Sequence, residues 1–292
     1  MKIVITGGRG QLGGDCRRVL APGHTVHAFG SGDLDITDEQ QVDNVVRRLQ
    51  PDIVINCAAY TAVDACEDDR ERCRLVNGTG PGLLAAATAD TGCKLIHVST
   101  DYVFDGKKPL PAAYREDDPV APLSAYGSSK LAGEEAVRQN SDNHLIIRTA
   151  WLYGMGGRNF LKTMLRLAVS DPRRTIRVVN DQFGSLTWTY RLALQIRRLL
   201  DSDLTGTVHA TAEGYGSWFD GAGRFLRAMG VEHSLEPCAT ADYPTAAPRP
   251  ANSILENRRL KKYCLNSMVS WEDDVERFAR EFRGPLLAEA RQ

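Results

Sequence analysis

A tyrosine and a lysine four residues apart could together donate a proton to a reacting oxygen. Tyr126 and Lys130 fall near the start of a helix-like segment, Ala125–Asn140, and residues i and i+4 share one helix face. A free phenol, with a pKa near ~10, is a poor acid at neutral pH, whereas a neighbouring ammonium stabilises the phenolate. The pair is therefore typical of a site that protonates the alkoxide formed when a carbonyl accepts a hydride.

Thr100 lies where a second hydrogen-bonding group would be needed. Residues 94–99 (KLIHVS) form an apolar run that predicts a buried strand, and ligands of open α/β sheets bind at the carboxyl ends of the strands. A hydroxyl at that edge can hydrogen-bond the substrate oxygen that Tyr126 protonates. A Tyr-x-x-x-Lys spacing alone also fits a chance surface pair, so the catalytic interpretation depends on this hydroxyl and on a glycine loop.

The glycine loop is in residues 1–13, which read MKIVITGGRGQLG. The spacing Gly7-x-x-Gly10-x-x-Gly13 directly follows a predicted strand and opens a predicted helix, which is the context of a dinucleotide fingerprint. Gly7 permits a tight turn, Gly10 lets backbone N–H groups approach a pyrophosphate, and Gly13 lets the helix pack closely on the strand. The helix N-terminus adds partial positive charge. The loop therefore predicts a bound dinucleotide.

Two features bear on which dinucleotide binds. An acidic residue at the end of the second strand would bind the ribose hydroxyls of NADH, but Gly30 and Ser31 follow that strand here. Arg9, inside the glycine loop, is suited to a 2′-phosphate. Both features favour NADPH, and NADH stays open because Arg9 fits a solvent-facing position equally well.

Composition and charge narrow the class of protein. The chain has 36 Lys and Arg against 37 Asp and Glu, so no excess of charge attracts nucleic acid or an anionic membrane. No apolar run approaches the ~18–20 residues that span a bilayer, and the first apolar run is too short for a secretory signal. The seven cysteines contain no C-x-x-C pair, which indicates reduced thiols. We therefore expect a cytoplasmic protein without nucleic-acid or membrane partners.

Strand-like and helix-like stretches alternate through the first half of the chain. A helix over 37–49 is expected to begin with a capping box of Thr37 and Gln40. Apolar strands separated by helices predict an α/β fold, a doubly wound, Rossmann-like parallel sheet covered on both faces. The predicted strands are Lys2–Thr6, Thr25–Phe29, 52–56, 94–99 and 144–148, and the helices are Gln11–Leu20, 37–49, 77–91 and Ala125–Asn140.

The pattern becomes less regular after about residue 149. Helices are predicted over 159–170, Thr189–Leu200, Trp218–Met229 and 272–283, short strands over 176–179 and 208–210, and an irregular proline-containing stretch over 236–253. We therefore predict a dinucleotide-binding domain over residues 1–150. Residues 151–292 would form a smaller, mixed α/β substrate-binding region, partly interwoven with the first domain.

Several longer motifs carry a resemblance to a known family. They are TGGRGQLGG (6–14), INCAAYTAVDACE (55–67), STDYVFDG (99–106), YGSSKLAGE (126–134), IRTAWLYG (147–154), NFLKTM (159–164), VVNDQFG (178–184) and RPANS (249–253). Over nearly its whole length the chain resembles the extended short-chain dehydrogenases/reductases and, within them, the dTDP-4-dehydrorhamnose reductases. The resemblance implies NAD(P)H-dependent reduction of the C4 ketone of dTDP-4-dehydro-L-rhamnose to dTDP-L-rhamnose.

The resemblance also implies roles for individual residues. Thr100, Tyr126 and Lys130 would be catalytic. The cofactor would contact Gly7, Arg9, Gly10, Gln11, Leu12, Gly13, Asp35, Ile36, Ala58, Ala59, Tyr60 and Lys130, and the nucleotide-sugar would face Asp101, Tyr102, Trp151, Asn159, Phe160 and Arg249. An arginine suits a diphosphate. Trp151 or Phe160 could stack on the sugar or thymine, although Trp151 fits a core position as well.

Two departures from the family pattern keep other substrates open. Pro248-Arg249-Pro250 has one basic residue where the family often has two, and Leu186 replaces a common proline. The alternatives are another nucleotide-sugar reductase or epimerase, or a non-catalytic dinucleotide-binding regulator resembling the beta subunit of methionine adenosyltransferase. Some family members bind Mg²⁺ at a dimer interface, for which Asp15 is the nearest candidate here. We predict no metal, and a homodimer stays open.

Overall fold

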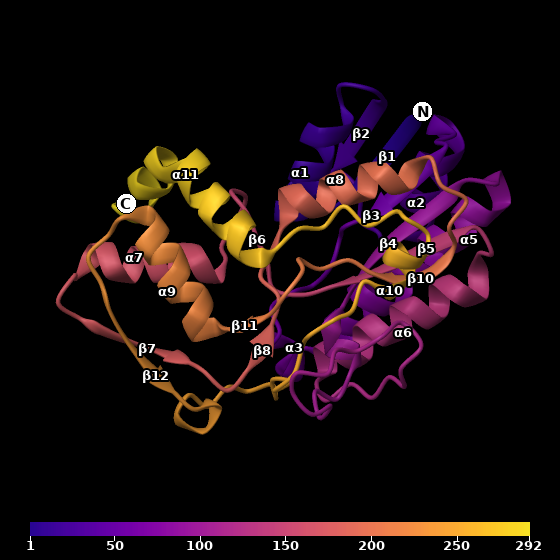
Figure 1. Ribbon diagram of the computed structural model, residues 1–292. Helices are drawn as coiled ribbons and strands as arrows, with labels where there is room; N and C mark the ends of the chain where they lie inside the picture. Colours follow the sequence, from indigo (N-terminus) through magenta and orange to yellow (C-terminus); the bar gives the residue numbers. More distant parts are fainter.

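A six-stranded parallel sheet forms the centre of the larger part of the molecule. The computed structural model describes residues 1–292, and the strand order is β10-β5-β4-β3-β1-β2 (Figure 1). Its strands are β1 (Lys2–Thr6), β2 (Thr25–Phe29), β3 (Ile53–Asn56), β4 (Lys94–Thr100), β5 (His144–Thr149) and β10 (Gly206–His209). Every pairing is parallel, which confirms the predicted Rossmann-like fold class.

Helices cover both faces of this sheet. On one face α1 (Gln11–Leu20) and α8 (Thr189–Leu200) pack against apolar side chains of the strands. The other face is covered by α2 (Glu39–Leu49), α5 (Gly80–Thr91) and α6 (Ala125–Asn140). The four central strands, β1, β3, β4 and β5, are buried, as their apolar runs require, whereas the edge strand β2 is partly exposed.

Two helix predictions in the first half were partly wrong. Helix α2 is capped by Asp38, whose carboxylate accepts from the Gln41 N–H at 3.1 Å, because the Thr37 hydroxyl donates instead to Asp35 at 2.7 Å. The helix predicted over 77–91 is preceded by α3 (Ala65–Asp68) and α4 (Arg70–Arg74), and it begins as a π-helical turn, Leu75–Thr79. This turn directs the buried Asn77 amide inward, where it accepts from the Tyr60 N–H at 2.8 Å.

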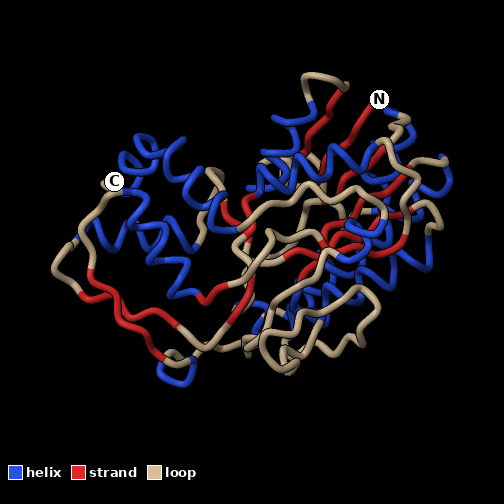
Figure 2. Tube along the Cα trace, viewed as in Figure 1, coloured by secondary structure: helices blue, strands red, loops and turns tan.

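The second part of the molecule has its own core. Helices α7 (Phe160–Ser170), α9 (Trp218–Met229) and α11 (Trp271–Ala290) pack together, beside a parallel pair of β7 (Thr175–Val179) and β12 (Ser234–Cys238). Small pairs join β8 (Phe183–Gly184) to β11 (Gly216–Ser217) and β6 (Leu152–Tyr153) to β9 (Thr187–Trp188). Long loops connect this part to the main sheet (Figure 2).

The chain returns to the main sheet after it has entered the second part. Helix α8 and strand β10 follow residue 151 in sequence but pack on the first half, and α10 (Arg258–Lys262) contacts β10. The stretch predicted as irregular, 236–253, begins inside β12 and overlaps its last three residues, Glu236–Cys238. Helix α11 runs past the predicted end at residue 283 and changes direction at Phe282 (φ −113°, ψ 15°).

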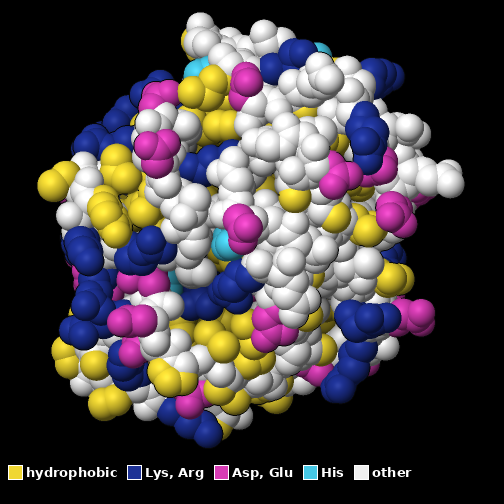
Figure 3. Space-filling model, turned by 90° about the vertical axis from the view of Figure 1, so that its right-hand side faces the viewer, with side chains coloured by type: hydrophobic (Ala, Val, Ile, Leu, Met, Phe, Trp, Pro, Cys, Tyr) yellow, Lys and Arg dark blue, Asp and Glu magenta, His cyan; other side chains and the backbone are white.

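The surface carries both signs of charge. On the face shown in Figure 3, Lys and Arg side chains lie among Asp and Glu side chains. No helix of the structure is both long and apolar enough to span a bilayer.

Candidate active site

Thr100 ends β4 at the carboxyl edge of the sheet. Its hydroxyl accepts from the Tyr102 N–H at 3.2 Å and so caps the short 3₁₀ turn Asp101–Val103. The same hydroxyl donates to Asp101 Oδ1 at 3.0 Å. Thr100 therefore lies at the carboxyl edge of the sheet, where the predicted strand placed it, and its hydroxyl is held by two hydrogen bonds to its neighbours.

Tyr126 lies in the first turn of α6, beside that edge. The helix begins at a Ser124 cap, whose hydroxyl accepts from the Gly127 N–H at 3.1 Å. A Cβ at Gly127 would lie 2.2 Å from the Tyr102 carbonyl oxygen, so only glycine lets the turn after β4 pack this closely on α6. The rings of Tyr102 and Tyr126 consequently meet edge to face, with centroids 5.4 Å apart.

Lys130 follows one turn later and is 2% exposed. Its ammonium donates to the Val98 carbonyl at 2.7 Å, which holds the side chain along β4 near Thr100. Burial lowers the pKa of Lys130 to about 8, and the carboxylate of Glu134 counteracts part of that change. The lysine is therefore a cation at neutral pH, with a proton that it can release near that range.

The pKa of Tyr126 differs from the sequence-based expectation. Burial raises the pKa of its phenol well above the usual value, and the Thr100 hydroxyl counteracts this in part. The raised pKa keeps the phenol protonated but makes it a weaker acid, so it can give its proton only to a strong base such as the alkoxide formed by hydride transfer. Thr100 thus supports the phenolate in the way that the sequence led us to expect of Lys130.

The glycine loop fits a dinucleotide pyrophosphate. Gly7 has φ +66°, and a Cβ there would lie 2.7 Å from the Ala58 nitrogen. A Cβ at Gly13 would lie 2.2 Å from the Gly7 carbonyl oxygen. The loop therefore has no room for a side chain at Gly7 or Gly13, and it forms a cradle with the N-terminus of α1, which begins with Gln11 and Leu12.

Arg9 lies at the end of β2. A Cβ at Gly30 would lie 2.7 Å from Arg9 Cδ, so the arginine stem lies over the glycine that follows this strand. The guanidinium is 75% exposed and pairs with Asp33 at 2.9 Å. A 2′-phosphate beside β2 could therefore compete with Asp33 for this cation.

The other residues expected at the cofactor surround the same cradle. Asp35 is exposed and its carboxylate accepts from the Thr37 N–H at 2.9 Å, whereas Ile36 is buried against Gly80. Ala58, Ala59 and Tyr60 follow β3 and are half-buried.

A large cavity of about 660 Å³ opens between the main sheet and the second part of the molecule. Four of the six residues expected at the substrate line it, namely Tyr102, Trp151, Phe160 and Arg249. Arg174 and Arg177 add positive charge to its wall, and Asp64 and Asp242 add negative charge. The cavity thus combines aromatic, apolar and cationic groups, which suits a sugar joined to a nucleotide by a diphosphate.

One face of the Trp151 ring is covered in this arrangement. It has a left-handed φ of +51°, and its ring stacks on Trp218 with centroids 3.6 Å apart and an interplanar angle of 11°. A Cβ at Gly184 would approach that ring within 2.7 Å. Trp218 therefore covers one face of the Trp151 ring, the Gly184 backbone lies close to the same ring, and the side chain lines the cavity.

Trp218 was missed by sequence reasoning. Its indole N–H donates to Gln182 Oε1 at 3.1 Å, and Phe160 lies against it with centroids 4.6 Å apart. The only sequence signal was its place at the start of a helix behind the Ser217 cap, and that signal says nothing of a cavity.

Arg249 is held by another residue that the sequence did not reveal. Its Nη2 pairs with Asp64 Oδ2 at 2.7 Å, and Asp64 Oδ1 accepts from the Ala247 N–H at 3.0 Å. The loop after β3 therefore fixes the C-terminal segment that carries the arginine.

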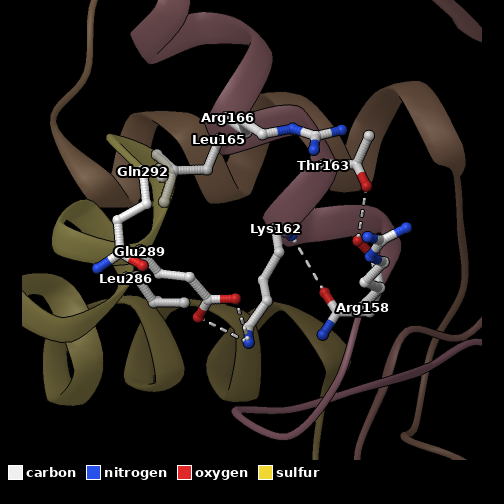
Figure 4. A pocket seen from close by; sticks show the side chains of 10 residues that line it. Arg158, Lys162, Thr163, Leu165, Arg166, Leu286, Glu289 and Gln292 are labelled. Atoms are coloured by element: carbon white, nitrogen blue, oxygen red, sulfur yellow. Dashed lines mark hydrogen bonds and ion pairs between the residues drawn. The ribbon is translucent and has the colours of Figure 1, made fainter.

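Asn159 and Asp101 lie outside the large cavity. The Asn159 amide caps α7 and donates to Gln11 Oε1 at 3.0 Å, so it connects α7 to the cofactor loop. It lines a smaller cavity of about 170 Å³, where Lys162 extends toward Glu289 at 2.8 Å (Figure 4). Asp101 is 3% exposed behind Thr100, its Oδ2 has no partner, and burial raises its pKa to about 6.

No group of three or more His, Cys, Asp or Glu side chains is arranged to hold a metal ion. Asp15, the residue considered for Mg²⁺, accepts from the Thr189 hydroxyl at 2.6 Å and pairs with Arg18 at 3.1 Å. Its carboxylate therefore has partners within the chain.

Comparisons with known proteins agree with this arrangement. The family model described as RmlD substrate binding domain matches residues 1–283. The dTDP-4-dehydrorhamnose reductase of Burkholderia thailandensis is 40% identical over 93% of this chain and 95% of its own length. The spore coat polysaccharide biosynthesis protein SpsK of Bacillus subtilis is 38% identical over 96% and 97%.

A solved structure is similar over the same span. It is the dTDP-4-dehydrorhamnose reductase of Bacillus anthracis in complex with NADP, which is 39% identical, covers 96% of this chain and 99% of its own, and superposes with a TM-score of 0.92. The UDP-glucose 4-epimerase of Thermus thermophilus shares the fold, with a TM-score of 0.83 at 19% identity. The chain therefore belongs to the RmlD family, whose members include the dTDP-4-dehydrorhamnose reductases.

Proposed function

We propose that this chain reduces the C4 ketone of dTDP-4-dehydro-L-rhamnose to dTDP-L-rhamnose with NADPH. The observation that carries the proposal is that Thr100 ends β4 at the sheet edge, with Tyr126 and Lys130 on α6 beside it, while Tyr102, two residues after Thr100, lines the large cavity. Family membership and the named reductase relatives support the choice of substrate.

The chain's own residues divide the work among them. The bound dinucleotide supplies the hydride, and the cradle of Gly7, Gly10 and Gly13 with the N-terminus of α1 holds its pyrophosphate. Tyr126 holds the proton that the new C4 hydroxyl receives, and the Thr100 hydroxyl hydrogen-bonds the substrate oxygen. The Lys130 ammonium is placed to orient the nicotinamide ribose.

NADPH is favoured over NADH by the residues around β2. No acidic residue ends that strand, and the Arg9 guanidinium lies beside it, paired only with the half-exposed Asp33. A 2′-phosphate gains a charge-assisted hydrogen bond from this arginine. The related reductase from Bacillus anthracis was solved with NADP.

The nucleotide-sugar fits the large cavity. Arg249 would bind the diphosphate, Tyr102 and Trp151 would face the sugar, and Phe160 would line the cavity beside Trp218, against which it packs. Asp101 acts from behind Thr100, and Asn159 acts through Gln11 of the cofactor loop. Residues 1–150 thus carry the cofactor and 151–292 most of the sugar site, with β10 returning to the main sheet. A homodimer and a cytoplasmic location stay predictions.

The test is oxidation of NADPH and of NADH by the purified protein with the keto-sugar as substrate. We expect turnover with a higher kcat/KM for NADPH, and a product that co-elutes with dTDP-L-rhamnose. UDP- and GDP-linked keto-sugars form the comparison panel. Preference for one of these would assign the chain to another nucleotide-sugar reductase, and no turnover of any substrate by a folded, NADPH-binding protein would favour a regulatory role.

A further inference from the structure

A third ionisable residue continues the row formed by Tyr126 and Lys130. Glu134 follows Lys130 by four residues on α6, so the three side chains share one face of the helix. All three are buried, and Glu134 is 0% exposed. A fully buried carboxylate needs partners.

Two arginines supply those partners. Arg148 on β5 donates Nε to Glu134 Oε1 at 2.8 Å and Nη2 to Oε2 at 2.7 Å, and Arg138 donates to Oε2 at 2.6 Å. The Arg148 guanidinium also lies over the Phe104 ring, 5.1 Å from its centroid. In the sheet Arg148 is opposite Ser99, and the next pair is Thr149 opposite Thr100. The Glu134–Arg148 pair therefore joins the helix of Tyr126 and Lys130 to the strand beside Thr100.

We propose that Glu134 is a positioning residue, which keeps the Lys130 ammonium charged in its buried site and holds α6 in register with Thr100. The kinetic part of this proposal rests on the reductase function proposed above. The electrostatic part does not, because it concerns the lysine of the protein alone.

The surroundings of Lys130 single out this carboxylate. Besides Glu134, the ionisable groups around the ammonium are the thiols of Cys57, after β3, and Cys73 on α4, His97 on β4, and the two arginines paired with Glu134. Burial lowers the pKa of His97 far below the usual value, so its ring is neutral. Glu134 has the largest effect among the groups that favour the charged lysine.

Two substitutions at the same ion pair separate this role from a structural one. Glu134→Gln removes the negative charge and Arg148→Met removes the positive charge, yet both break the pair. If the pair only held α6 in place, both variants would change activity without moving its pH dependence. If Glu134 supports the lysine charge, the two pKa shifts of Lys130 have opposite signs.

The kinetic measurement is kcat/KM against pH at saturating NADPH. We expect the alkaline limb to move to lower pH by about one unit in E134Q and to higher pH in R148M. On the falling, alkaline part of the profile, the kcat/KM of E134Q would be about tenfold below that of the wild type at the same pH. Shifts of the same sign in two folded variants, or no shift in either, would overturn the proposal.

A second measurement needs no turnover. The folded pKa of Lys130 lies below the unfolded value of 10.5, so the contribution of this one group to the stability of the nucleotide-free protein rises as pH increases between about 8 and 10.5. This rise should begin at lower pH in E134Q and at higher pH in R148M, as read from chemical denaturation at a series of pH values. If E134Q does not fold, the shift in R148M alone tests the proposal. We expect R148M to fold, because Glu134 still has Arg138 as a partner in that variant.

A matched control is the buried pair of Asp274 on α11 and Arg191 on α8, 2.9 Å apart. Asp274 is 1% exposed and lies outside the catalytic site. Asp274→Asn should lower stability at every pH and leave the alkaline limb unmoved. A shift of that limb in D274N equal to that in E134Q would contradict a specific role for Glu134. If turnover is absent but the denaturation shifts are opposite, the reductase assignment fails and the role of Glu134 stands.

Discussion

Gly13→Ala should damage the cofactor cradle, and the neighbouring Gly14→Ala should not. A Cβ at Gly13 would lie 2.2 Å from the Gly7 carbonyl oxygen, whereas the nearest atom to a Cβ at Gly14 is 4.0 Å away. Cβ atoms in proteins essentially never lie within 3.0 Å of another heavy atom. To reach that separation, α1 must move most of an ångström away from the loop. Both alanines add the same methyl group to adjacent positions of one helix.

The size of the effect follows from these contacts. Overpacking of this kind lowers the free energy of unfolding by about 1–3 kcal/mol. Weakening one charge-assisted hydrogen bond to the pyrophosphate costs about 1.5–3 kcal/mol, or about ten- to hundredfold in Kd. Gly14→Ala should instead raise the free energy of unfolding by about 0.5–1 kcal/mol, because alanine is favoured over glycine within a helix.

Two assays check this pair of variants. Urea denaturation gives the free energy of unfolding, and quenching or enhancement of NADPH fluorescence gives the Kd. The reasoning would be refuted if G13A bound NADPH as tightly as G14A in a protein of wild-type stability.

Three further predictions concern the buried Asp101 and two residues of the large cavity, Asp64 and Trp218. Burial raises the Asp101 pKa from 3.8 to about 6, which at about 1.4 kcal/mol per pKa unit destabilises the fold by roughly 3 kcal/mol at pH 7. Asp101→Asn should therefore gain stability at pH 7 and lose that gain as pH falls from 6 toward 4, and denaturation curves showing no such pH dependence would contradict this. Asp64→Asn should change the free energy of unfolding by under about 1 kcal/mol, since the carboxylate is 48% exposed. The same variant should raise the KM for the nucleotide-sugar severalfold. An unchanged KM would exclude the proposed support of Arg249 by Asp64. Trp218→Ala should raise that KM about tenfold and lower the free energy of unfolding by about 3 kcal/mol. A wild-type KM in this variant would show that the stack of Trp218 on Trp151 does not contribute to substrate binding.

The parts of the site that sequence predicts are those encoded by local spacing. The strand, the glycines of the cradle and the first turn of α1 are contiguous, so the pattern around Gly7 and Gly13 predicts their geometry. The i, i+4 spacing of Tyr126 and Lys130 likewise requires only that α6 forms. Thr100 could be placed because a parallel sheet brings the carboxyl ends of its strands to one edge.

Contacts between distant segments could not be predicted in this way. Arg249 is positioned by Asp64, 185 residues earlier, and no local pattern relates the two. The same holds for Trp151 and Trp218, whose stacking depends on how α9 packs beside the end of β5. Asn159 was expected at the sugar, but its role as the cap of α7 uses both ends of its amide.

Burial also changed the chemistry expected of the catalytic pair. From spacing alone, the lysine was expected to make Tyr126 more acidic. In the folded chain both groups are desolvated, so the pKa of Tyr126 rises and that of Lys130 falls. The effect of each neighbour on these two pKa values depends on how α6 packs on β4, and the periodicity of the sequence does not predict that packing.

The most direct test of the central claim is the turnover of Tyr126→Phe with NADPH and dTDP-4-dehydro-L-rhamnose. The substitution removes only the phenol oxygen from a side chain that is 9% exposed. The fold should therefore be unchanged, and the Kd for NADPH should stay within about twofold of the wild-type value. We predict that kcat falls by roughly 10²–10⁴-fold. Wild-type turnover in this variant would contradict the assignment of Tyr126 as the proton donor.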